Sequence, residues 1–122
     1  MRYLVLIASD PGDWERATPE ERQGYFDAHD AFERALAAQG TKVSGAPLAS
    51  ADTATTLRHE GDRLTVTDGP FVELVEQVAG FYLVDLPDLD AAVSVCAHLP
   101  RSYAVEIRPT IEIEGYEPPR DL

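Results

Sequence analysis

Cysteine is nearly absent from this chain of 122 residues. The single one, Cys96, excludes a disulfide within one molecule and any metal site built from several cysteines. Long apolar runs are also missing, since none approaches the roughly 20 residues that a bilayer-spanning helix needs. We therefore expect a protein of a reducing compartment, the cytoplasm, that has no contact with membranes.

Positive charge is scarce as well. Ten Lys and Arg residues stand against 22 Asp and Glu residues, which gives a net charge of −12. A field of this sign repels phosphate backbones and anionic lipids, so we expect no nucleic-acid or membrane partner. The remaining composition, 44% apolar and 26% charged, is that of one ordinary globular domain.

Capping and periodicity predict two helices. Thr18-Pro19-Glu20-Glu21 places a capping Thr before a Pro at the first helical position and a Glu at the third, so a helix begins there. We expect it to run to about Gln39 and to end at Gly40. Asp88 caps a second helix that ends at Pro100. Its expected inner face consists of Leu89, Ala92, Val93, Cys96 and Leu99.

Strand patterns occupy most of the remaining chain. Residues 2–8 are apolar at both parities, which predicts a central strand. Gly61-Asp62 suits a type II′ turn between two short strands. The other predicted segments are strands at 42–49, 55–59, 63–67, 80–86 and 103–113, a loop at 50–53, a helical turn at 73–78 and a loosely ordered tail at 114–122.

The order of these elements is the split pattern of a ferredoxin-like α+β fold. Two helices can cover only one face of the sheet that this pattern forms. A small domain commonly covers the other face with a second copy of itself, so we expect a homodimer.

His29 is the first candidate for chemistry, because it lies on the apolar stripe of the first helix with Tyr25, Phe32 and Leu36. It is either a core histidine or a general acid or base. The adjacent Asp30 points about 100° away on a helix, so a partner must come from another segment. A carboxylate partner would raise the pKa of His29, whereas burial alone would lower it.

The run Asp68-Gly69-Pro70-Phe71-Val72-Glu73 is the second candidate, since amphipathic periodicity does not explain it. Asp-Gly and Gly-Pro pairs mark turns by backbone preference alone, so this run can also be a simple hairpin corner. Asp68 and Glu73 are nevertheless the best carboxylate partners for His29.

Three further residues complete the candidate set. Glu73 and Glu76 would share a face of a helical segment, either as paired carboxylates or as solvated side chains. Glu106 and Arg108 share a strand face, where they form an ion pair unless Arg108 binds an anion. His29, His59 and His98 lack chelating spacing and no glycine-rich phosphate loop is present, so we expect neither a metal nor a cofactor.

Several strings together resemble the D-G-P-F branch of the YCII-related family. They are D-G-P-F-x-E at 68–73, E-Q-x-x-G-F-Y at 76–82, D-L-P-D-L-D-A-A at 85–92, and Glu106-Ile107-Arg108-Pro109. His29, eleven residues before Gly40, resembles the histidine of that family's first helix. The branch usually has Thr-Lys where this chain has Leu74-Val75, so one cation of the family site is missing here.

The resemblance implies a YCII-related domain over residues 1–113, followed by the tail at 114–122. It also implies ferredoxin-like protomers that form a dimeric α+β barrel, with a cavity beside a His and Asp pair. Activity in this family is generally unassigned, and members of the branch are often encoded near sigma factors of the extracytoplasmic-function type.

Two functional hypotheses follow. In the first, His29 and Asp68 are catalytic and Glu73, Glu76 and Arg108 bind a small-molecule substrate. In the second, the same pocket serves a non-catalytic, ligand-sensing regulatory module linked to an extracytoplasmic-function sigma factor.

Overall fold

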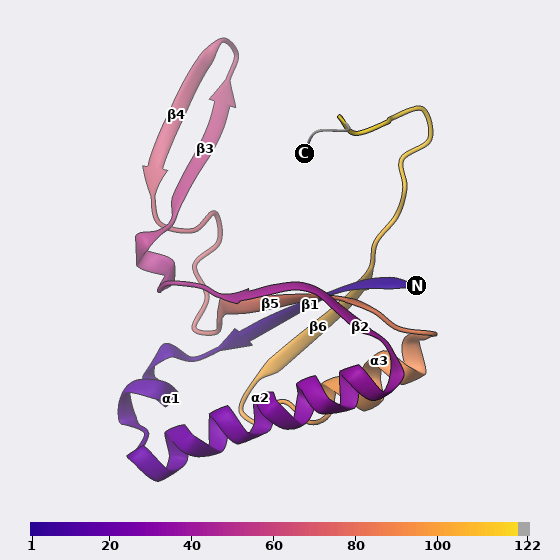
Figure 1. Cartoon of the computed structure of the whole chain (residues 1–122). Coiled ribbons are helices and arrows are strands. Elements are labelled where there is room, and N and C mark those ends of the chain that lie inside the picture. Colours follow the sequence, from indigo (N-terminus) through magenta and orange to yellow (C-terminus); the bar gives the residue numbers. More distant parts are fainter. Residues whose placement is uncertain (120–122) are drawn as a thin grey trace.

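The computed structural model describes residues 1–119, which form a four-stranded antiparallel sheet, a separate two-stranded hairpin and three α-helices (Figure 1). The strand order of the main sheet is β2-β5-β1-β6. The elements are β1 (Arg2–Ser9), α1 (Pro11–Arg16), α2 (Pro19–Gln39), β2 (Thr41–Pro47), a 3₁₀ turn η1 (Ala51–Thr53), β3 (Thr55–Glu60), β4 (Arg63–Asp68), β5 (Gln77–Asp85), α3 (Leu89–Cys96) and β6 (Ala104–Pro109).

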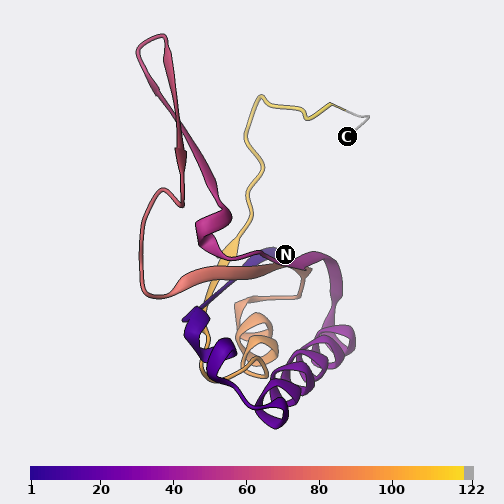
Figure 2. The same ribbon diagram turned by 90° about the vertical axis from the view of Figure 1, so that its left-hand side faces the viewer.

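This topology is mixed α+β and consistent with a ferredoxin-like fold into which the β3–β4 hairpin is inserted. Helices α2 and α3 cover one face of the main sheet, and both views show the opposite face without a helix (Figures 1 and 2). The core lies between the helices and the sheet. Its buried members are Tyr3, Val5, Ile7, Phe32, Leu36, Val84, Leu86, Ala91, Ala92, Val95, Cys96 and Leu99.

The predicted start of α2 is confirmed. The Thr18 hydroxyl accepts from the Glu21 amide at 3.1 Å, and the Glu21 carboxylate accepts from the Thr18 amide at 3.2 Å. The helix ends at Gln39, as expected, but Gly40 has an extended backbone with φ −168°. A Cβ there would lie 1.9 Å from the Asp85 carbonyl oxygen, so close approach to β5 requires this glycine.

Several predicted elements differ from the structure, among them the loop expected at 50–53, which contains η1, and the second helix, which ends at Cys96 rather than at Pro100. The segment expected only to break the first strand forms α1, because the Asp10 carboxylate accepts from the Gly12 amide at 2.9 Å and Pro11 suits the first helical position. The predicted helical turn at 73–78 is wrong, since β5 already begins at Gln77, paired with Ser9 of β1. The last strand, expected to reach residue 113, ends at Pro109.

Helix α3 has the predicted cap, with Asp88 accepting from the Ala91 amide at 2.8 Å. Its inner face is confirmed at Ala92, Cys96 and Leu99, which are buried, and differs at two positions. Leu89 and Val93 are each 53% exposed, whereas Ala91 and Val95 are buried. The predicted apolar stripe was therefore wrong at Leu89 and Val93, which face solvent.

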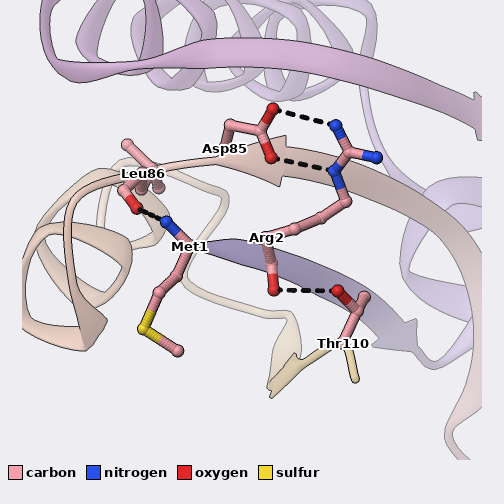
Figure 3. A network of polar contacts seen from close by, with 5 residues as sticks. All are labelled: Met1, Arg2, Asp85, Leu86 and Thr110. Carbon is pink, nitrogen blue, oxygen red and sulfur yellow. Dashed lines mark hydrogen bonds and ion pairs between the residues drawn. The ribbon is translucent and has the colours of Figure 1, made fainter. Parts of the chain in front are cut away.

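A polar network fastens the beginning of β1 to its neighbours (Figure 3). The Met1 amino group donates to the Leu86 carbonyl at 2.8 Å, and the Arg2 guanidinium makes two bonds to Asp85, at 2.9 and 3.0 Å. The Thr110 amide donates to the Arg2 carbonyl at 2.9 Å. This last bond fixes the point from which the C-terminal segment leaves the sheet.

The sheet face without helices, here called the open face, carries alternate residues of each strand. Leu4 and Leu6 of β1 lie on it, beside Phe81 and Leu83 of β5. The β3–β4 hairpin and the segment after β6 both extend beyond this face, away from the helices (Figures 1 and 2). Within residues 1–119, no helix has both the length and the apolar character that crossing a bilayer requires.

Candidate functional site

His29 of α2 lies between two tyrosine hydroxyls. Its Nδ1 is 2.8 Å from the Tyr82 hydroxyl of β5, and its Nε2 is 3.0 Å from the hydroxyl of Tyr103, the residue before β6. The fold brings these three side chains together from three elements that are far apart in the sequence. Both imidazole nitrogens therefore have a hydrogen-bond partner.

The strand register explains why Tyr82 points toward α2. Tyr82 shares the helix-facing side of β5 with Gly80 and Val84, and its ring centroid is 4.5 Å from that of Phe32. Its neighbour in β2 is Gly45, where a Cβ would lie 2.8 Å from the Tyr82 ring. A side chain at position 45 would therefore displace the tyrosine from His29.

Tyr103 is held by a second aromatic contact. The Tyr25 and Tyr103 ring centroids are 5.8 Å apart, and the Tyr25 hydroxyl is 3.0 Å from Ser102 Oγ. Tyr25 precedes His29 by four residues, so both face the same side of α2. The predicted stripe of the first helix thus continues into the site.

Burial determines the protonation of this group. It lowers the pKa of His29, an effect that the charges of Glu33 and Asp30 oppose only in part. Burial also raises the pKa of Tyr82 to about 12 and raises the pKa of Tyr103. At neutral pH the imidazole is therefore neutral and both hydroxyls keep their protons.

A neutral imidazole has one N–H donor and one acceptor nitrogen. One tyrosine oxygen accepts from the ring and the other hydroxyl donates to it. Reversing both hydroxyls and the tautomer moves the proton from one side of the ring to the other. The Tyr82–His29–Tyr103 chain can thus relay a proton without a change in net charge.

The chain lines a cavity of about 380 Å³, which is within the size range of small-molecule sites. A second cavity of about 410 Å³ adjoins it and shares Trp14, Tyr25 and Tyr103. Trp14 lines both cavities, and its ring centroid lies 5.7 Å from that of Phe26 and 4.6 Å from the Arg22 guanidinium carbon.

Lys42 is the cation of this cavity. Its Nζ lies 2.5 Å from Glu33 Oε1 and 5.5 Å from the centroid of the Tyr82 ring. Lys42, Tyr82 and Tyr103 were not among the residues predicted for the site. Only Tyr82 carried a usable signal, because its alternation with Val84 places it on the buried side of a strand.

The predicted partners of His29 lie elsewhere in the protomer. Asp68 is the last residue of the hairpin, paired with Thr55 of β3, and Glu73 is exposed in the segment that follows. No carboxylate of the predicted set lines the His29 cavity within the described residues. The expected pocket of His29, Asp68, Glu73 and Arg108 therefore does not form in one protomer, and tyrosines take the place of the acids.

The two remaining predicted ligand-binding residues also lie apart from His29. Glu76 borders an apolar cavity of about 440 Å³ beside Phe71 and Leu74. Arg108 lies on the open face, where its Nε is 2.6 Å from Glu106 Oε2. This is the ion pair expected from the strand pattern, made between two exposed side chains.

No three or more His, Cys, Asp or Glu side chains in the described part of the chain are grouped to hold a metal ion. The lone cysteine, Cys96, is buried in the core, and burial raises the pKa of its thiol to about 11. A protonated thiol is a weak nucleophile. Within residues 1–119, the His29 group is the candidate for acid-base chemistry, because it joins a half-buried imidazole to two tyrosine hydroxyls beside a cavity.

Comparison with known proteins supports the resemblance seen in the sequence. Residues 1–114 match the model of the YCII-related domain. The chain belongs to this family. Over 113 residues it is 34% identical to "Uncharacterized protein R00369" of Rhizobium meliloti (strain 1021), across 89% of this chain and 91% of that protein. The YCII-related match spans β1 to β6, so both the His29 site and the D-G-P-F turn lie inside it.

Proposed function

We propose that this YCII-related protein binds a small molecule in the His29 cavity and that His29 exchanges a proton with it. The observation that carries the proposal is the pair of hydrogen bonds that join the two ring nitrogens to the hydroxyls of Tyr82 and Tyr103, at the wall of a cavity of about 380 Å³. Such a chain both orients the imidazole and gives it a path for its proton.

The lining indicates how a ligand would be held. Trp14, Phe26 and Pro47 offer apolar surface, and the hydrogen-bonded His29, Tyr82 and Tyr103 supply polar groups of the lining. A carbonyl or hydroxyl oxygen that enters there replaces one of the tyrosine bonds and receives or gives a proton at His29. Lys42 is already paired with Glu33, so the cavity favours ligands that do not need a free cation as a partner.

A ligand-sensing role without turnover is the second candidate. It is favoured by the same geometry, because both ring nitrogens are satisfied before any ligand enters. In this case binding alters the protein surface rather than the ligand, as a regulator linked to a sigma factor of the extracytoplasmic-function type would require. Chemical change of the bound molecule distinguishes the two candidates.

Trp14 provides the test, since it is the single tryptophan of the chain and lines the cavity. Titration of a library of small phenols, ketones and enols should change its fluorescence for compounds that bind. Tyr103→Phe removes one hydroxyl and is expected to weaken those compounds at least about tenfold. Tyr116→Phe, an exposed tyrosine outside the cavity, is the matched control. Equal affinities for the two variants would contradict the proposed site.

We also propose a homodimer in which the open faces of two copies pack into a barrel. Leu4, Leu6, Phe81 and Leu83 give this face an apolar centre that no described element covers. Its charges cancel, because Arg2 pairs with Asp85 and Arg108 pairs with Glu106. Two copies with a net charge of −12 each meet the least repulsion on such a face.

Light scattering tests the dimer. The expected mass is twice that of the 13.4 kDa chain at tens of micromolar, at both low and high salt. A monomer under both conditions would refute it.

A further inference from the structure

The β3–β4 hairpin is amphipathic, and its apolar side is uncovered. The register pairs Leu57 with Val66 and His59 with Leu64, so the three apolar side chains share one face. Leu57 is 60% exposed, Val66 59% and Leu64 49%. An isolated two-stranded hairpin is only marginally stable in water, and both of its edges can accept another strand.

The segment that follows β6 has the sequence of a strand without a partner strand. Ile111 and Ile113 alternate with Glu112 and Glu114, the period-2 pattern of a half-buried strand. The two isoleucines are 83% and 65% exposed. The structure therefore leaves an unpaired strand sequence at one end of the open face and an unpaired hairpin edge at the other.

The segment after β6 cannot reach the β3–β4 hairpin of its own chain in this structure. The segment leaves beside Tyr3, and residues 69–76 connect the hairpin to β5 at Gln77, the residue paired with Ser9. At about 3.3 Å per residue along six residues and about 4.8 Å per strand across two strand steps, these points are roughly 22 Å apart across the sheet. The five residues from Thr110 to Glu114 span at most about 18 Å, so they end short of the junction at which the connection to their own hairpin meets the sheet.

We propose that residues 110–114 of one copy add a third strand to the β3–β4 hairpin of a second copy. Ile111 and Ile113 then join the Leu57 and Val66 face. Glu112 and Glu114 lie on the other face, which carries Arg58 and Arg63. This inference rests on the proposed homodimer and adds an exchange of arms to it.

Charge complementarity selects a second copy as the partner. The polar face of the hairpin has two arginines and one acid, Glu60, whereas residues 110–119 have three glutamates and no basic residue. Opposite charges across neighbouring strands stabilise their pairing, and like charges oppose it. In a chain with only 10 basic residues, this match attracts two copies that otherwise repel each other.

A charge-exchange experiment separates pairing between copies from pairing within one. One full-length variant carries Arg58→Glu and Arg63→Glu, and another carries Glu112→Lys and Glu114→Lys. Each homodimer then has like charges at both strand additions, but a mixed dimer has opposite charges at both. Native mass spectrometry of the mixture should show mixed dimers in clear excess over random pairing, and each variant alone should dimerise about tenfold more weakly than the wild type.

In the matched control, the hairpin variant is replaced by one that carries both Arg34→Glu and Arg101→Glu. These two exposed arginines lie outside the hairpin. The control should show no preference for mixed dimers. If the wild type is dimeric but the hairpin and tail variants pair at random, the strand exchange is refuted and the homodimer is not. A monomeric wild type would overturn both.

Discussion

Replacing His29 by glutamine should leave the fold intact and cost little stability at neutral pH. The imidazole makes two hydrogen bonds, to Tyr82 and Tyr103, and is half-buried rather than part of the core. Glutamine keeps a donor and an acceptor and retains at least one of these bonds. Because one net hydrogen bond contributes about 0.5–1.5 kcal/mol, we expect a loss near the lower end of that range.

The informative quantity is the pH dependence of that loss. Burial lowers the pKa of His29 in the folded state below its unfolded value of about 6.5. Between the two pKa values the unfolded state binds more protons, so acid favours unfolding. The contribution of His29 is therefore complete above pH ~6.5 and is lost as the pH falls through the folded pKa. Glutamine does not titrate, so the gap between wild type and variant should shrink on acidification.

Urea unfolding followed by circular dichroism, at pH values of about 7.5 and 5, measures this difference. Tyr103→Phe is the control, because it removes one bond but keeps the titrating imidazole and should retain the wild-type pH dependence. An NMR titration that gave His29 a pKa above about 6.5 would refute the reasoning, since it would place an unseen carboxylate beside the ring. Equal pH dependence in wild type and glutamine variant would refute it as well.

Three further substitutions test the fold. Thr18→Ala removes the acceptor for the Glu21 amide and should cost about 1 kcal/mol in urea unfolding, whereas a cost below a few tenths would show that the cap is energetically idle. Gly69→Ala should lower the free energy of opening the hairpin by about 1–3 kcal/mol, measured by hydrogen exchange of the amide at position 69, because alanine is strained at φ +101°. Lack of space is not the cause, since nothing lies within 4 Å of a Cβ at this position. Unchanged protection of this amide would show that the turn does not require glycine. Leu36→Ala, at a side chain 1% exposed, should cost about 2–5 kcal/mol, while Leu89→Ala, 53% exposed, should cost under about 0.5; similar losses would show that the core is misplaced.

Local signals predicted the elements that local interactions determine. Thr18 and Asp88 cap their helices through hydrogen bonds three residues away, which short sequence motifs encode directly. The interior position of β1 followed from apolar residues at both parities. Such features need no knowledge of the remaining chain, and this is why they were confirmed.

Elements decided by distant pairing were predicted less well. Glu73 and Glu76 have helical spacing, but Gln77 and Val78 pair with the end of β1, and this ladder draws the segment into β5. The strand expected to reach residue 113 ends at Pro109, because Ile111 and Ile113 have no neighbouring strand among residues 1–119. Period-2 alternation predicts a strand only where another strand is available.

The partners of His29 show the same limit at the level of the site. Asp68 is only 14 residues from Tyr82, yet it belongs to the β3–β4 hairpin, which extends beyond the open face (Figures 1 and 2). His29 belongs to α2, which covers the opposite face of the sheet. Tyr103 reaches the ring from the other end of the chain. A carboxylate from the D-G-P-F turn can therefore meet a His29 imidazole only if the hairpin of one copy passes around the edge of another. The proposed catalytic role of Asp68 thus depends on the dimer, whereas the Tyr82–His29–Tyr103 chain is complete within each protomer.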